Sequence, residues 1–129
     1  MSTNQPLREA DVILKNLCKN NGDIQGGAII SNDGRLLTHT FAEQKISARV
    51  AIIAGVLVSL CKHSHDTIHI GDFKEFHLQG KARSAVVYGF DNALLLLVIK
   101  NGANIGLISL EGSQAARAIA QHFIDRSRN

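Results

Sequence analysis

The chain has 129 residues with a net charge of +3, and 45% of its residues are hydrophobic while 19% are charged. This composition excludes a disordered chain, and the length fits one domain with its own core but not two ordinary domains. The 14 basic residues are spread along the chain, with one Tyr and no Trp, so nucleic acid, which favours a basic stripe and stacking aromatic residues, is not the expected partner.

The first predicted elements are a helix and a β-hairpin. Apolar residues recur at helical spacing over residues 7–18. β-Branched residues mark a strand over residues 24–31, and residues 35–40 form its partner. Between them, Asp33-Gly34 predicts a two-residue turn in which both residues take a positive φ. Gly26-Gly27 near the start of the first strand predicts a bulge or a close approach by another part of the chain.

A helix, three strands and a last helix are predicted for the rest of the chain. The helical period returns over residues 43–62 and again from about residue 103 to residue 125. Strands are predicted at residues 73–79, 82–88 and 93–100, with turns at residues 80–81 and 91–92. The run at residues 93–100 is apolar on both sides, so this strand is expected to be central and covered on both faces.

The element order α-β-β-α-β-β-β-α predicts an α/β (α+β) fold, with a five-stranded antiparallel sheet and helices on its faces. We expect a single domain over residues 7–126, with flexible termini at residues 1–6 and 127–129. The chain begins without the apolar stretch of a signal peptide, and Cys18 and Cys61 are too few for a secreted disulfide framework. We therefore expect reduced thiols, a cytoplasmic location and no membrane contact.

The helix predicted at residues 43–62 has no side suited to water. One side carries large residues expected to pack on the sheet, namely Ile46, Val50, Ile53, Leu57, Leu60 and Cys61. The other side is small or apolar, with Ala48, Ala51, Ile52, Gly55, Val58 and Ser59. A helix that is apolar all round must be buried all round. A second copy of the chain in a two-fold dimer is the favoured cover, ahead of another helix of the same chain or a different partner protein.

The strand predicted at residues 73–79 supports self-association. It alternates apolar and charged residues, as an edge strand does, and Phe76 and Leu78 lie on its apolar side. An unprotected edge tends to recruit another strand, so pairing with its own symmetry mate would join two sheets. The predicted dimer interface comprises Ala48, Ala51, Ile52, Gly55, Val58, Ser59, Phe76 and Leu78.

Most of the chain, from about residue 7 to residue 123, resembles the roadblock/dynein light chain family. The matching stretches are the hairpin at residues 26–37, the Ala-rich second helix, residues 73–80 and residues 93–107. The resemblance implies a roadblock/profilin-like fold and homodimers joined through the second helix and the third strand. It also implies partnership with Ras-like small GTPases, as in bacterial MglB-like gliding regulators, or attachment to motor and signalling scaffolds. The resemblance implies no active site, and the family offers no motif arginine that could be transferred as an arginine finger.

Two features depart from the family pattern. One is Gly112-Ser113, which interrupts the last helix. The other is a His-rich segment in which Cys61, His63, His65, Asp66 and His69 could all bind zinc. Their spacing matches no standard zinc finger, so a solvated loop with pH-responsive histidines is favoured over a metal site.

The sequence indicates neither an enzyme nor a cofactor. It contains no Gly-x-Ser-x-Gly motif and no carboxylate pair placed for acid–base chemistry. The basic residues Lys74, Lys81, Arg83, Arg117, Arg126 and Arg128 are interpreted as a solvated surface, with a contact patch for an acidic partner as the alternative. The sequence thus predicts a non-catalytic homodimeric module that regulates or scaffolds a Ras-like small GTPase. The alternative is a small-molecule sensor, which the bulky core residues disfavour.

Overall fold

The computed structural model describes residues 5–69, 71, 74–90 and 93–127. The predicted order of elements is confirmed. The elements are α1 (Gln5–Asn20), β1 (Ile24–Ser31), β2 (Leu36–His39), α2 (Gln44–Ile68), β3 (Glu75–Gln79), β4 (Arg83–Phe90), β5 (Ala93–Lys100) and α3 (Ile105–Ser127). The turn predicted at residues 91–92 lies outside the described residues, as do residues 1–4 and 128–129 of the termini.

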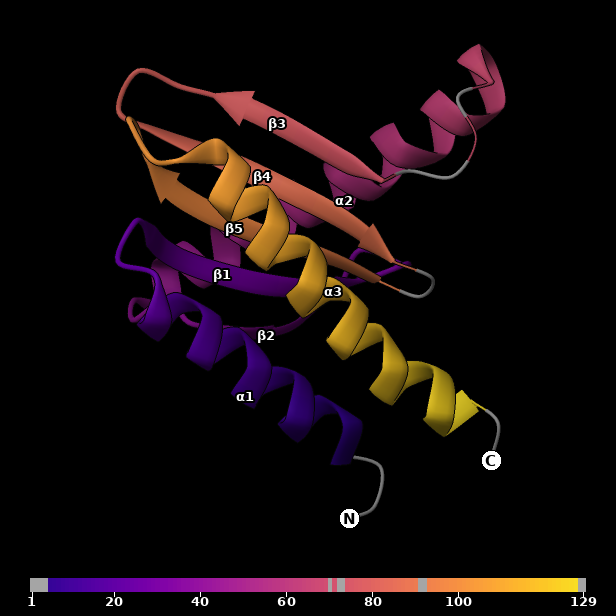
Figure 1. Cartoon of the computed structure of the whole chain (residues 1–129). Helices are drawn as coiled ribbons and strands as arrows, with labels where there is room; N and C mark the ends of the chain where they lie inside the picture. Colours follow the sequence, from indigo (N-terminus) through magenta and orange to yellow (C-terminus); the bar gives the residue numbers. More distant parts are fainter. Residues whose placement is uncertain (1–4, 70, 72–73, 91–92, 128–129) are drawn as a thin grey trace.

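The five strands form one antiparallel sheet in the order β2-β1-β5-β4-β3. Helices α1 and α3 lie side by side on one face, and α2 crosses the other face alone (Figure 1). Strand β5 is central and buried almost throughout, as its apolar sequence predicts. Strand β3 is an edge strand, which also agrees with the sequence-based expectation.

The β1–β2 turn differs from the predicted two-residue form. Ser31 and Arg35 are joined by a backbone hydrogen bond of 2.8 Å, and the Gly34 N–H donates to the Ser31 carbonyl at 3.0 Å. The loop therefore has three residues, and Gly34, with φ of 83°, takes the left-handed position while Asp33 does not. In the common three-residue hairpin loop, a turn is followed by a single left-handed residue. Only the glycine therefore needs a positive φ. The hairpin was predicted correctly, but its turn type was not.

Helix α2 ends six residues later than the sequence pattern indicated. It continues to Ile68 and ends at His69, whose φ of 56° is left-handed. Its last turns extend beyond the sheet (Figure 1). Most residues there are polar and exposed, and the single apolar residue, Ile68, gives no apolar period to detect. The prediction of a His-rich loop is therefore wrong, because His63 and His65 lie within the helix.

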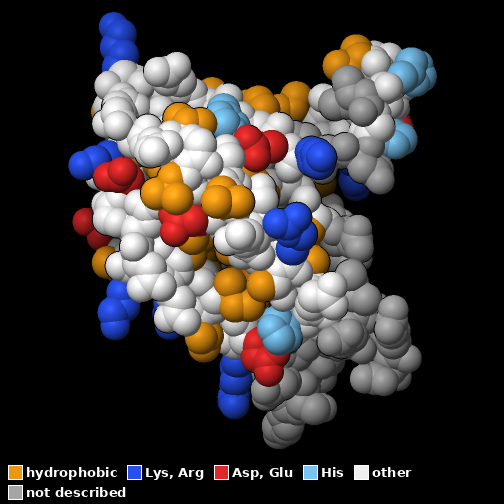
Figure 2. Space-filling view, in the orientation of Figure 1, with side chains coloured by type: hydrophobic (Ala, Val, Ile, Leu, Met, Phe, Trp, Pro, Cys, Tyr) orange, Lys and Arg blue, Asp and Glu red, His pale blue; other side chains and the backbone are white. Residues whose placement is uncertain are grey.

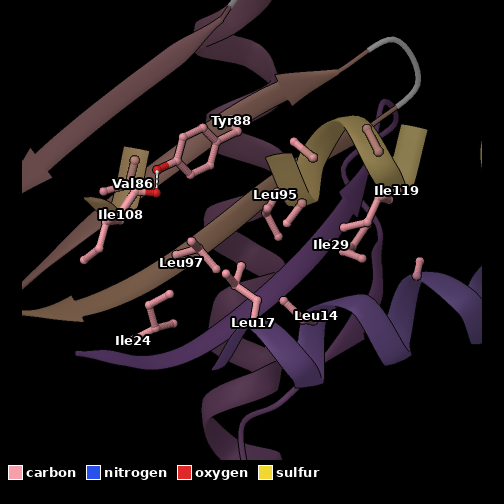
Figure 3. Close-up of a cluster of buried hydrophobic side chains, with 14 of the residues drawn as sticks. Leu14, Leu17, Ile24, Ile29, Val86, Tyr88, Leu95, Leu97, Ile108 and Ile119 are labelled. Carbon is pink, nitrogen blue, oxygen red and sulfur yellow. Dashed lines mark hydrogen bonds between the residues drawn. The ribbon is translucent and has the colours of Figure 1, made fainter. Parts of the chain in front are cut away.

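One core layer fills the space between the sheet and helices α1 and α3. Leu14 of α1, Leu95 of β5 and Ile119 of α3 are all fully buried and meet in this layer (Figure 3). The ring of Tyr88 reaches towards the start of α3, where its hydroxyl donates to the Ile108 carbonyl at 3.1 Å. A Cβ at Gly112 would lie 2.4 Å from that ring. The glycine that interrupts the α3 pattern therefore makes room for Tyr88.

A smaller core layer lies between the sheet and α2. Ala28 and Ile30 of β1 pack there with the α2 residues Val50, Ala54 and Leu57. These α2 residues recur after four and three positions, so they form a narrow stripe along one side of the helix.

The two cysteines lie on opposite faces of the sheet. Cys18 packs against the α1–α3 layer and Cys61 against the α2 layer, and both are free thiols. The sheet between them prevents a disulfide within one subunit. Burial raises the pKa of the Cys18 thiol, although a hydrogen bond with Thr40 opposes this rise, and burial also raises the pKa of Cys61.

We expect both thiols to react slowly in the folded protein, because the reactive thiolate is disfavoured by burial. At pH 8, modification by Ellman's reagent should be at least about tenfold slower in the native protein than in guanidinium chloride. The measurement is the time course of absorbance under the two conditions. Equal rates would show that the thiols are open to solvent and would contradict the packing of Cys18 and Cys61.

Candidate interaction surface

The main candidate site is the outer face of α2, defined here by Ile46, Ala48, Ile52, Ile53, Gly55, Val56, Ser59 and Leu60, all of which are exposed. Ile52 and Val56 are the most open of its large side chains, with 72% and 64% of their surface accessible. A shallow groove on this face is lined by Ile52, Gly55, Val56, Ser59, Leu60 and His63. An exposed apolar surface of this kind is typical of a site for another macromolecule.

The exposed side of α2 carries large apolar residues, interrupted by the exposed Arg49, and the structure corrects which residues face the sheet. Ile46, Ile53 and Leu60 were expected to pack on the sheet and are instead 41%, 49% and 43% exposed. The buried stripe is centred on Ala54, a small residue that the preference for bulky side chains overlooked. The spacing of Val50, Ala54, Leu57 and Cys61 is the signal that could have given the correct phase.

Covering of this face by another helix of the same chain is excluded by the fold. Helices α1 and α3 both lie on the opposite face of the sheet (Figure 1). The β1–β2 turn does come close to α2, because a Cβ on Gly34 would lie 3.1 Å from the Gly55 Cα. A Cβ on Gly55 itself would meet no atom within 4 Å, so this position points into open space.

The predicted interface residues fall into two groups. Ala48, Ile52, Gly55 and Ser59 belong to the outer face of α2, whereas Ala51 and Val58 are half-buried at its margin. The second group is Phe76 and Leu78, which lie on the α2 side of the sheet because they pair with Val87 and Ala85 of that layer. Val56 is a large exposed member of the face that the sequence reasoning did not include.

Strand β3 presents its apolar side chains on the same side as α2. Phe76 is half-buried, and Leu78 is 59% exposed. In the part of the chain that the structure describes, β3 is hydrogen-bonded only to β4, so its other edge carries unpaired backbone groups. The outer face of α2 and the apolar side chains of β3 are therefore exposed on the same side of the sheet, and β3 also has an open edge.

The His-rich end of α2 is built from local contacts. The His63 ring lies 2.8 Å from the Ser59 carbonyl, and the His65 ring lies 3.1 Å from the Asp66 carboxylate. Figure 2 shows histidine side chains on the protruding end of the molecule, open to solvent. Within the described residues, no group of three or more His, Cys, Asp or Glu side chains is arranged to hold a metal ion.

The other side of β3 carries residue types that occur in hydrolase triads, but their contacts are in the wrong order. The Glu75 carboxylate accepts from Ser109 at 3.2 Å, and the His77 ring lies 2.5 Å from the same oxygen. A nucleophilic serine needs the histidine, not the carboxylate, as its partner. Burial raises the pKa of the nearby Tyr88 to about 12, with a smaller contribution from the Glu75 charge. Tyr88 therefore stays protonated and acts as a structural donor.

Among the described helices, none is both long and apolar enough to cross a membrane.

No family model matches the chain, and no curated protein matches it in sequence. Solved structures do match its fold over most of its length. The gliding protein MglB from Thermus thermophilus is 22% identical with a TM-score of 0.76, and a structure described as MglB with tetrameric arrangement is 23% identical with the same score. Both matches cover 92% of this chain and 90% of the other. A Roadblock/LC7 domain from Streptomyces avermitilis is 11% identical with a TM-score of 0.76, over 88% of this chain and 97% of that domain. The chain therefore has the fold of the roadblock and MglB domains, as its sequence predicted.

Proposed function

We propose that this chain is a non-catalytic homodimeric interaction module of the cytoplasm that regulates or scaffolds a Ras-like small GTPase. The observation that carries the proposal is the exposed apolar outer face of α2. Large side chains such as Ile52 and Val56 are left open to water there, while only the narrow stripe of Val50, Ala54 and Leu57 is buried against the sheet. Covering this face with a second subunit would remove its apolar surface from water, which is the main favourable term in most protein association.

A two-fold dimer fits this face because the same residues then serve both subunits. Gly55 leaves space for a second helix to come close, and the exposed Ile52, Val56 and Leu60 around it supply apolar contact. The apolar side chains of β3 lie on the same side of the sheet as α2, and β3 is an edge strand. A symmetry mate could therefore also pair with β3 and extend the sheet. We propose Ala48, Ala51, Ile52, Gly55, Val58, Ser59, Phe76 and Leu78 as the contact, together with Val56.

The GTPase partner is proposed from the resemblance to the roadblock family and from the shared fold with MglB. The description of one MglB structure as tetrameric supports self-association as a property of that protein. The sensor alternative has less support, because it needs a cavity between sheet and helices. Leu95, Leu97 and Ile119 are fully buried in that layer instead.

The partner can be tested with purified Ras-like GTPases from the source organism, each loaded with GDP or with a non-hydrolysable GTP analogue. Immobilised full-length protein should bind one of them with an affinity that differs at least about tenfold between the two nucleotides, a difference of about 1.4 kcal/mol. The chain alone should not hydrolyse GTP. Binding that ignores the nucleotide, or no binding to any GTPase, would contradict the regulatory role.

A further inference from the structure

A second groove lies on the opposite side of the sheet from α2. It runs between the end of β4 and the middle of α3, and it is lined by Lys74, Tyr88, Gly89, Phe90, Ser113, Ala116, Arg117, Ala120 and Gln121. None of these residues belongs to the proposed dimer contact. A ligand in this groove could therefore bind to a single subunit or to a dimer.

The groove exists because α3 turns small side chains towards the end of β4. Ser113, Ala116 and Ala120 recur after three and four positions and so share one side of the helix. Longer residues at these positions would fill the space above the sheet. The floor is apolar, since Tyr88 is buried and the half-buried Phe90 packs against the core.

The rim of the groove is basic. Lys74 stands on the strand side and Arg117 on the helix side, and both side chains are exposed. Among the described residues that line the groove, no carboxylate is present. Glu75, the acidic residue next in sequence to Lys74, is already bound to Ser109 and His77. In Figure 2, which looks onto this side, Lys and Arg side chains lie over the region between β3 and α3.

We propose that this groove docks an acidic segment of a partner protein. Carboxylates of the segment would pair with Lys74 and Arg117, and an adjacent large apolar side chain would lie on Phe90 between the small side chains of α3. Paired charges on both rims fix the orientation of the segment, while the apolar floor supplies contact area. A second copy of this basic chain, with its net charge of +3, is a poorer occupant than an acidic protein.

Selection of random 12-residue peptides displayed on phage against the full-length protein tests this proposal. The enriched peptides should carry Asp or Glu next to Leu, Phe or Trp. A fluorescein-labelled copy of the strongest peptide is then titrated with protein, and anisotropy gives the affinity. The variant carrying Lys74→Glu and Arg117→Glu should bind at least about tenfold more weakly. Ala120→Leu, which fills the groove without changing charge, should weaken binding in the same direction.

The matched control carries Lys81→Glu and Arg83→Glu, which make the same change in net charge at the β3–β4 hairpin. It should bind the peptide nearly as well as the unchanged protein. Equal loss in both double variants would mean attraction to overall charge and would overturn the groove as the site. Enriched peptides without acidic residues would overturn the proposal, as would the absence of enrichment. Binding of phosphatidylserine vesicles without peptide binding would assign the groove to membranes and would also overturn it.

Discussion

Replacing Gly55 by arginine should convert the proposed dimer to a monomer with an unchanged fold. The Cβ at this position points into open space, so the new side chain meets nothing in its own subunit. Loss of a glycine from a helix interior even favours the helix by about 1 kcal/mol. In the dimer, however, the arginine would lie between two apolar helix faces without a partner for its charge. We expect dissociation to become easier by at least about 100-fold, or roughly 3 kcal/mol.

Sedimentation velocity over a range of protein concentrations measures this change, and far-UV circular dichroism checks the fold. Ile52→Arg should act in the same way, because Ile52 is the most exposed large side chain of the face. Val12→Arg is the matched control, since Val12 is 55% exposed on α1, on the other side of the sheet. It should leave the dimer intact. If Gly55→Arg stayed dimeric, or if the unchanged protein were a monomer at high concentration, the proposed contact would be wrong.

Alanine should have opposite effects at the two helical glycines Gly55 and Gly112. At Gly112 the added Cβ would lie 2.4 to 2.6 Å from side-chain atoms of Tyr88, a buried residue whose hydroxyl donates to the Ile108 carbonyl. Either the ring or α3 must move, and overpacking of this kind costs roughly 1–3 kcal/mol of unfolding free energy. At Gly55 the same substitution meets open space and should stabilise the subunit by up to about 1 kcal/mol.

Chemical denaturation followed by circular dichroism gives both values, and each variant is measured over a range of protein concentrations so that the contribution of dimerisation is separated from the stability of the subunit. The double variant Tyr88→Phe with Gly112→Ala distinguishes the effect of the ring clash from that of the hydroxyl hydrogen bond, because it keeps the clash and removes the hydrogen bond. A stability of Gly112→Ala equal to that of the unchanged protein would contradict the close packing of α3 on Tyr88. So would a gain in stability.

Much of the fold follows from local patterns in the sequence. The β-branched residues of β1, the continuous apolar run of β5 and the helical period of α1 depend on neighbours close in the chain, so these elements can be read directly from the sequence. The phase of α2 is harder to read, because apolar residues lie on several sides of the helix and the spacing of the buried residues competes with that of the larger exposed ones. The buried side is set by the shape of the sheet beneath it, where the small Ala54 fits and the larger Ile53 does not face inward.

The candidate sites were predictable to different degrees. The exposed face of α2 was expected because four of its residues, Ala48, Ile52, Gly55 and Ser59, are small or apolar where a charged side chain would be usual. The groove near Phe90 could not be predicted from the sequence, because it forms only where α3 crosses the end of β4. The sequence did contain one signal, the Gly112-Ser113 interruption in α3, whose meaning depends on a tyrosine in another element.

The placement of α2 alone on one side of the sheet has a consequence for partners that bind elsewhere. If two subunits meet through α2, each keeps its α1 and α3 turned away from the other, and any pocket on that side is present twice in the pair. A partner carrying two acidic stretches joined by a linker of suitable length could then occupy both pockets at once. The apparent affinity of such a partner would exceed that of either stretch alone by about 10²- to 10⁴-fold without any new contact. A groove with low affinity for one acidic stretch could therefore still give a stable complex with the two-stretch partner.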